Sequence, residues 1–180
     1  MTKKIILIVG PSGVGKDTLI KNAKKKLEDN DDFNFVKRYI TREPDDNEMN
    51  YYVKKTAFDL LKNNNHFVSH WKAHGNSYAI AKECIDKKVN IISISRKHIK
   101  DFEVFFDDVT TIHITIPKVV LLNRLRLRAR ESEAQIMERI QRTYEELDGK
   151  NIIEFENNDT IDKSSKKFVK LLKKISNIKG

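Results

Sequence analysis

Short apolar runs, each bounded by turn residues, recur along the chain. Five of them have the length and β-branched content of buried strands, and they span residues 5–9, 35–40, 90–94, 111–116 and 152–155. Segments with helical periodicity lie between them, at residues 17–27, 119–128, 133–147 and 164–175. This alternation predicts an α/β fold in which helices cover both faces of a parallel central sheet.

Residues 41–78 depart from that alternation. Polar turn residues occupy positions 43–50, and strand-like alternation follows at 51–53 and 67–78. We therefore expect a small inserted subdomain at about residues 41–80. Because 180 residues are too few for two ordinary domains, we expect residues 1–180 to form one domain.

The first predicted strand leads into a glycine-rich loop, which a predicted helix follows directly. The loop reads Gly10-Pro11-Ser12-Gly13-Val14-Gly15-Lys16-Asp17-Thr18, with the spacing G-x-x-x-x-G-K of a phosphate-binding P-loop. Loop amides and the helix N-terminus supply partial positive charge to a triphosphate, and Lys16 adds a full charge. The alternative, an ordinary glycine-rich turn, would not explain why the lysine and the helix are in register. We expect residues Gly10 and Ser12 to Thr18 to bind ATP.

Asp17 stands where a Ser or Thr usually follows the P-loop lysine, and Thr18 comes one residue later. A carboxylate beside ATP would repel phosphate unless a cation lay between them. We therefore expect the Thr18 hydroxyl, or Asp17 through water, to help hold Mg²⁺ on the terminal phosphates. Asp17 is equally typical of a residue that starts a helix.

Arginines gather between residues 124 and 142, a segment that we interpret as a lid. Phosphoryl transfer needs several converging cations because negative charge spreads over the oxygens of the transition state. Lys16, Arg128 and Arg139 are the predicted catalytic residues, with Arg124 at the nucleotide and Arg130 at the acceptor. The alternative is a basic helix face paired with neighbouring glutamates.

The charge of the chain permits several partners. Its net charge of +9 is compatible with nucleic acid but equally with a small polyanionic substrate. We expect a small-molecule phosphate acceptor, either a sugar bisphosphate or a nucleoside monophosphate, and neither nucleic acid nor membrane. Cys84 is the only cysteine, which favours the reducing cytoplasm, and both a monomer and a homodimer fit the sequence.

Three histidines, His66, His70 and His74, recur at a spacing of four. On a helix they would stack and could bind a metal, but the residues around them alternate as in a strand. No carboxylate completes a zinc spacing, so we do not interpret them as a metal site.

The loop, the arginine segment and two further stretches resemble the guanylate kinase superfamily over nearly the whole chain. The two stretches are Arg38-Tyr39-Ile40-Thr41-Arg42 and Gly75-Asn76-Ser77-Tyr78. Within it the chain most resembles the ribose 1,5-bisphosphate phosphokinases of phosphonate breakdown. Gly15 to Thr18, Arg38 to Arg42, Ser93 to Arg96 and Asn157 to Asp159 carry this closer match.

The resemblance implies an ATP-dependent phosphotransferase with a P-loop kinase fold. It implies that the acceptor is bound by residues of the middle of the chain: Arg38, Thr41, Arg42, Glu48, Tyr78, Ser93, Ser95 and Arg96. It also implies that Asn157 or Asn158 lies near adenine, although a plain Asn-Asn-Asp turn is the alternative.

Departures from true guanylate kinases indicate a different acceptor. Asp45 stands where those enzymes carry a second phosphate-binding arginine, and Ser69 and Ser93 or Ser95 stand where they carry guanine-binding carboxylates. Hydroxyl groups cannot replace two charged acceptors, so discrimination for guanine should be poor, whereas hydroxyls suit a sugar. A guanylate kinase and a non-catalytic binding module of the same fold remain the alternatives.

Overall fold

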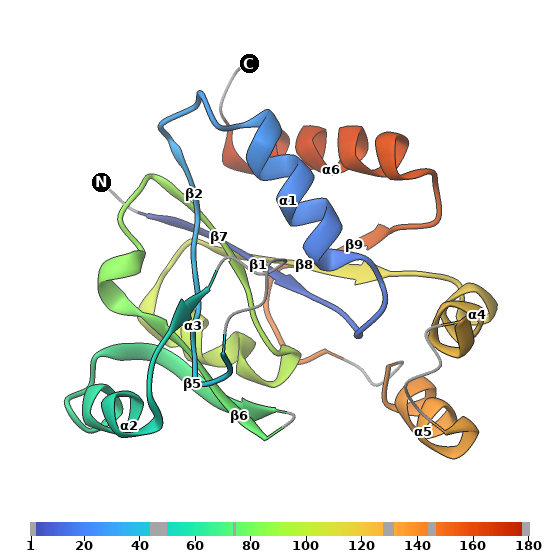
Figure 1. Cartoon of the computed structure of the whole chain (residues 1–180). Coiled ribbons are helices and arrows are strands. Elements are labelled where there is room, and N and C mark those ends of the chain that lie inside the picture. Colours follow the sequence, from blue (N-terminus) through green and yellow to red (C-terminus); the bar gives the residue numbers. More distant parts are fainter. Residues whose placement is uncertain (1–2, 44–49, 74, 128–131, 144–146, 178–180) are drawn as a thin grey trace.

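The computed structural model describes residues 3–43, 50–73, 75–127, 132–143 and 147–177. Two sheets organise this part of the chain (Figure 1). The larger sheet has the strand order β2-β7-β1-β8-β9, and every strand pair in it is parallel. Its strands are β1 (Lys4–Val9), β2 (Phe33–Phe35), β7 (Val89–Ser93), β8 (Val109–Thr115) and β9 (Ile152–Glu156). The predicted α/β fold with a parallel central sheet is confirmed.

Helices α1 (Lys16–Lys26) and α6 (Ile161–Ser176) lie side by side on one face of this sheet (Figure 1). Helix α3 (Ile99–Phe105) packs toward the opposite face, against the side chains of the second sheet. Helices α4 (Lys118–Leu127) and α5 (Glu133–Thr143) lie together beyond the carboxyl end of β8. In the described part of the chain, no helix has both the length and the apolar character needed to cross a bilayer.

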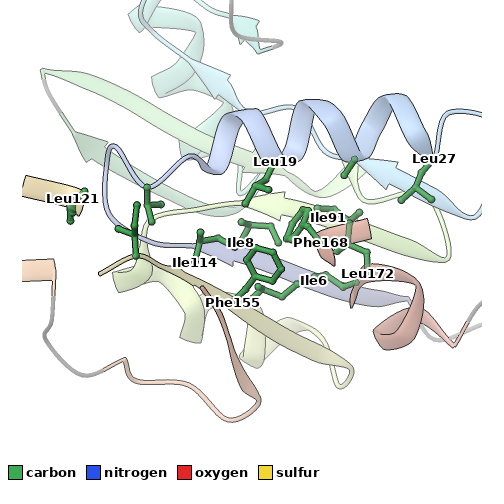
Figure 2. Close-up of a cluster of buried hydrophobic side chains, with 14 of the residues drawn as sticks. Ile6, Ile8, Leu19, Leu27, Ile91, Ile114, Leu121, Phe155, Phe168 and Leu172 are labelled. Atoms are coloured by element: carbon green, nitrogen blue, oxygen red, sulfur yellow. The ribbon is translucent and has the colours of Figure 1, made fainter. Parts of the chain in front are cut away.

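Strand β1 is buried on both faces. Ile6 and Ile8 pack into the cluster beneath α1 and α6, where Figure 2 shows them with Phe155 and Phe168. Ile5, Leu7 and Val9 point into a second cluster with α3. A fully buried Ile or Leu side chain stabilises the folded state by about 1.5–3 kcal/mol. Strand β1 is therefore well anchored in the core, and it fixes the start of the loop that follows it.

The second sheet has the order β4-β3-β6-β5 and lies between residues 39 and 81. It consists of β3 (Tyr39–Ile40), β4 (Tyr51–Tyr52), β5 (Phe67–Ala73) and β6 (Asn76–Ala81), with helix α2 (Lys55–Asn63) between β4 and β5. The chain leaves and rejoins the parallel sheet around this unit, as expected of an insertion.

Sequence-based boundaries were wrong at two places. The run 35–40 is two strands in different sheets, because β2 pairs with β7 whereas β3 pairs with β4 and β6. The described part of the helix predicted for 133–147 covers Glu133–Thr143, and Leu147 is not helical. Helices α2 and α3 were missed, because both are short and interrupted by polar residues.

Candidate functional site

The loop between β1 and α1 has the backbone of a phosphate cradle. Gly10 and Gly15 have φ angles of +149° and +94°, which side chains of L-residues rarely allow. A Cβ atom on Gly10 would lie 2.5 Å from the backbone oxygen of Ile114. Val14 is fully buried and fixes the loop to the core. The sequence therefore places glycine where the backbone has no room for any other residue.

Helix α1 begins directly at this loop. Gly15 occupies its N-cap position and has no side chain with which to cap the helix. The first amide groups of α1 are thus left to bind an anion, and the helix dipole favours negative charge at the same place.

Lys16 lies back across its own loop. Its Nζ donates hydrogen bonds to the backbone oxygens of Gly10 at 2.7 Å and Pro11 at 2.8 Å. Burial lowers the pKa of Lys16 to about 8, the charge of Asp17 opposes this shift, and the charge of Arg38 adds to it. Lys16 therefore remains mostly protonated at neutral pH, and an incoming phosphate would raise its pKa again.

A cavity of about 330 Å³ opens between the loop, α4 and the start of α6. Gly13, Gly15, Thr18, Arg124 and Asn157 line it, with Asp159 and Ser164 at its α6 side. The buried Asn157 side chain donates a hydrogen bond of 2.7 Å to the backbone oxygen of Val14. Its amide nitrogen would lie 2.5 Å from a Cβ on Gly15. The glycine-rich loop and the segment after β9 therefore pack closely against each other.

Of the two asparagines considered for the nucleotide, only Asn157 lines this cavity, and Asn158 is exposed. Asp17 and Thr18 are exposed on the first turn of α1, next to the loop, and Ser12 is exposed on the loop itself.

Arg38 and Arg96 are two predicted acceptor residues that lie near the loop. Arg38 comes just before β3, lies over the Tyr78 ring at 5.7 Å and is close enough to lower the pKa of Lys16. Arg96 belongs to the short 3-10 helix η2 (Arg96–His98), which follows β7. Its position is set by the Ile94 amide, which donates a hydrogen bond to the Ile8 oxygen on β1. Both arginines thus converge on the carboxyl end of the parallel strands, where ligands bind in open α/β sheets.

His113 is a site residue that the sequence reasoning missed. It pairs with Val9 in the sheet register, one residue before the loop, and its side chain is half-buried. Burial lowers its pKa; Glu154 opposes the shift, while Arg96 and Lys16 add to it. The alternation of β8 could have indicated this position, since Ile112 and Ile114 face the other side.

The remaining predicted acceptor residues lie on neighbouring elements. The Thr41 hydroxyl, just after β3, accepts a hydrogen bond of 2.9 Å from the Ser77 amide, and Arg42 follows Thr41. Tyr78 is buried on β6, Ser93 ends β7, and Ser95 is the N-cap residue of η2.

Part of the predicted site falls outside the described residues, namely Glu48, Arg128 and Arg130. Arg139 belongs to α5, but its side chain lies outside the described part of the structure. Arg126, which the sequence did not single out, pairs with Glu133 and joins α4 to α5. Within the described residues, no three His, Cys, Asp or Glu side chains form a metal-binding group.

Sequence and structure comparisons identify the family. The sequence profile of guanylate kinase matches residues 2–175. The chain belongs to the guanylate kinase family. Among solved structures, guanylate kinase from Anaplasma phagocytophilum has a TM-score of 0.62 at 20% identity and covers 99% of this chain and 88% of that one. A gluconokinase from Sinorhizobium meliloti has a TM-score of 0.55 at 11% identity, with coverage of 98% and 95%. These two likenesses concern the fold alone.

Curated relatives within the guanylate kinase family are closer in sequence. "Ribose 1,5-bisphosphate phosphokinase PhnN" of Bradyrhizobium diazoefficiens is 33% identical over 174 residues, which cover 94% of this chain and 88% of that protein. The protein of the same name from Rhodopseudomonas palustris is 34% identical over 144 residues, covering 78% and 74%. The resemblance identified from the sequence is confirmed.

Proposed function

We propose that this chain transfers the γ-phosphoryl group of ATP to ribose 1,5-bisphosphate and forms 5-phosphoribosyl 1-diphosphate and ADP. The observation that carries the proposal is the P-loop with its buried Lys16, set in a chain that matches curated ribose 1,5-bisphosphate phosphokinases over most of its length. We place the reaction in the cytoplasm, where ATP is made and a lone thiol such as Cys84 stays reduced.

The nucleotide would occupy the loop and the 330 Å³ cavity beside it. Loop amides and Lys16 bind the β- and γ-phosphates, while Arg124 and Asn157 lie where the nucleoside would extend. The exposed Thr18 hydroxyl and Asp17 carboxylate offer hard oxygen ligands of the kind Mg²⁺ prefers. Mg²⁺ takes few protein ligands and completes its shell with phosphate oxygens and water, so this donor set fits it. When bound, the metal would neutralise charge on the phosphates.

The acceptor phosphate is already ionised at neutral pH and needs no strong general base. One of its oxygens attacks the γ-phosphorus in line, the bond from that phosphorus to the β–γ bridging oxygen breaks, and ADP leaves with both electrons. Lys16, Arg38 and Arg96 hold the two negatively charged reactants together, and the arginines of the 124–142 segment stabilise the transferring group and exclude water.

Guanylate kinase activity is the second candidate, because the family match itself favours it. The positions that we associate with guanine recognition carry Ser69, Ser93 and Ser95, and the Ser69 hydroxyl is already hydrogen bonded to Asp101. A base that offers two N–H donors would find hydroxyls there instead of free carboxylates. We therefore rank the sugar bisphosphate above GMP.

Side-by-side assays test the proposal. ADP formation is measured with ATP, magnesium and either ribose 1,5-bisphosphate or GMP, and the sugar product is separated from ADP, which also has a diphosphate, before its own two coupled diphosphate signals are identified in ³¹P NMR. We expect kcat/KM for the sugar to exceed that for GMP by at least about 100-fold. A preference for GMP would make the chain a guanylate kinase, and no transfer to either acceptor would indicate a binding module.

A further inference from the structure

Three aromatic rings from β5, β6 and η2 stand in a row. The indole of Trp71 on β5 is stacked with the ring of Tyr78 on β6, with centroids 5.7 Å apart and planes 7° apart. Trp71 is also stacked with the imidazole of His98 on η2, at 5.5 Å and 28°. Trp71 and Tyr78 are buried. A planar base that stacked on Trp71 would have to displace one of the rings of the protein.

Tyr78 connects this row to the cations near the P-loop. Arg38 covers the Tyr78 ring and adds to the lowering of the Lys16 pKa. At the other end, His98 follows Arg96 by two residues, and the His98 amide donates a hydrogen bond of 2.9 Å to the Ser95 oxygen. The three rings therefore connect Arg38, which lies near the P-loop, to His98.

The orientation of the His98 ring is fixed by a carboxylate. Its Nδ1 lies 2.8 Å from Oδ2 of Asp101, and the Ser69 hydroxyl donates to the same oxygen at 2.5 Å. An ionised carboxylate only accepts hydrogen bonds, so His98 carries its proton on Nδ1. In the tautomer with its proton on Nδ1, Nε2 carries the lone pair of the ring.

Nε2 of His98 has no hydrogen-bond partner among the described residues, and 26% of the side chain is exposed. A ring that is stacked, oriented by a carboxylate and still presents an unused acceptor atom is prepared for a ligand. The ligand group that complements a lone pair is a hydroxyl. Free ribose hydroxyls are the groups of this kind that a sugar bisphosphate carries.

We propose that His98, oriented by Asp101 and Ser69, accepts a hydrogen bond from a hydroxyl group of the phosphorylated sugar acceptor and so helps to select a sugar over a planar base. This assignment rests on the proposed function. It adds His98 as an acceptor-binding residue and Asp101 as a residue that positions it. Trp71 supports His98 from one ring face.

The test is a set of four single variants and one double variant with ribose 1,5-bisphosphate as the acceptor. His98→Phe keeps a ring for the stack with Trp71 but has no nitrogen, whereas His98→Gln places an amide near the position of Nε2. Asp101→Asn removes the orienting carboxylate. His70→Phe is the matched control, because His70 is an exposed histidine adjacent to Trp71 on the same strand.

We expect His98→Phe to raise the acceptor KM about 10-fold, which is the loss expected for one hydrogen bond to a well-placed partner. The ATP KM, kcat and Tm should stay close to those of the wild type. His98→Gln should recover part of the loss. Asp101→Asn should raise the acceptor KM less than His98→Phe and add nothing in the His98→Phe background.

Each other outcome is informative. An acceptor KM of His98→Phe within twofold of the His70→Phe value overturns the assignment, as does an equal rise in the ATP KM, which would indicate a structural role. These results leave the proposed function standing. If the wild-type protein does not phosphorylate ribose 1,5-bisphosphate, the proposed function fails first and the role of His98 fails with it.

Discussion

The proposed nucleotide half of the site is built from backbone, whereas the proposed acceptor half is built from side chains. In the first half, glycines with positive φ and the uncapped start of α1 present amide groups, and Lys16 is the main charged contribution. In the second half, Arg38, Trp71 and His98 come from three separate elements and meet only in the folded chain. Backbone recognises what all nucleoside triphosphates share, and side chains can change from one acceptor to another.

The largest effect should follow from Lys16, the cation of the P-loop itself. Lys16→Met should lower kcat at least about 1,000-fold with either acceptor, because the transferring phosphate loses its buried charge partner. Steady-state ADP formation measures the effect. Lys21→Met, on an exposed position of the same helix, is the control and should retain full activity with an unchanged circular dichroism spectrum. A Lys16→Met protein with more than a tenth of wild-type activity would remove the P-loop from the mechanism.

Gly10→Ala tests whether the loop backbone has room for any side chain. The new Cβ would lie 2.5 Å from the Ile114 oxygen at a φ of +149°, so we expect unfolding to require about 2–4 kcal/mol less in urea titrations. Gly75→Ala is the matched variant, because its φ is +76° but no atom lies within 4 Å of the new Cβ. It should cost only about 1 kcal/mol. Equal losses at the two sites would refute the steric explanation.

Asn157→Ala tests the single side chain that braces the loop from outside. The variant loses the hydrogen bond to the Val14 oxygen and a wall of the cavity, and ATP affinity should fall about 10-fold in calorimetric titrations. The acceptor KM should not change, because Asn157 belongs to the nucleotide half. Asn158→Ala provides the comparison, since Asn158 is exposed and should tolerate the change. If both variants bind ATP as the wild type does, Asn157 is only part of a turn.

The smallest effect concerns pH. The Lys16 pKa is lowered to about 8, and bound phosphate should raise it again, so ATP binding takes up a proton near this pH. Affinity should fall about twofold between pH 7 and 8 and about fivefold between pH 8 and 9. The same shift means that the unfolded chain holds the proton more tightly between pH 8 and 10.5. The free energy of unfolding of the wild type should therefore rise with pH in that interval, relative to that of Lys16→Met. If the two proteins give parallel curves of unfolding free energy against pH, the lowered pKa of Lys16 is contradicted.

The backbone-built half could be predicted from the sequence almost residue by residue. Gly10 to Thr18 are contiguous, and the strand and helix that flank them have clear periodicity, so the motif contains its own structural context. Asn157 was also named, but its hydrogen bond joins residues 143 positions apart, and only the fold brings them together.

The side-chain-built half could be predicted only in part. Arg38, Tyr78 and Arg96 were named through the family resemblance, yet Trp71, His98 and Asp101 were not. These residues come together only because strand β5 of the second sheet lies against the 3-10 helix η2, which follows β7 of the parallel sheet. No local sequence pattern indicates this contact. The run 35–40 failed for a related reason, because apolar content does not show where a chain passes from one sheet to another.

The contact between Asn157 and Val14 also has a consequence for the order in which the protein is synthesised. The amide that supports the glycine-rich turn leaves the ribosome 143 residues after Val14, to which it binds. A nascent chain that stops before β9 can contain every residue of the motif and still lack its support. The ability to bind a nucleotide should thus arise only after Asn157 has emerged and packed against the loop.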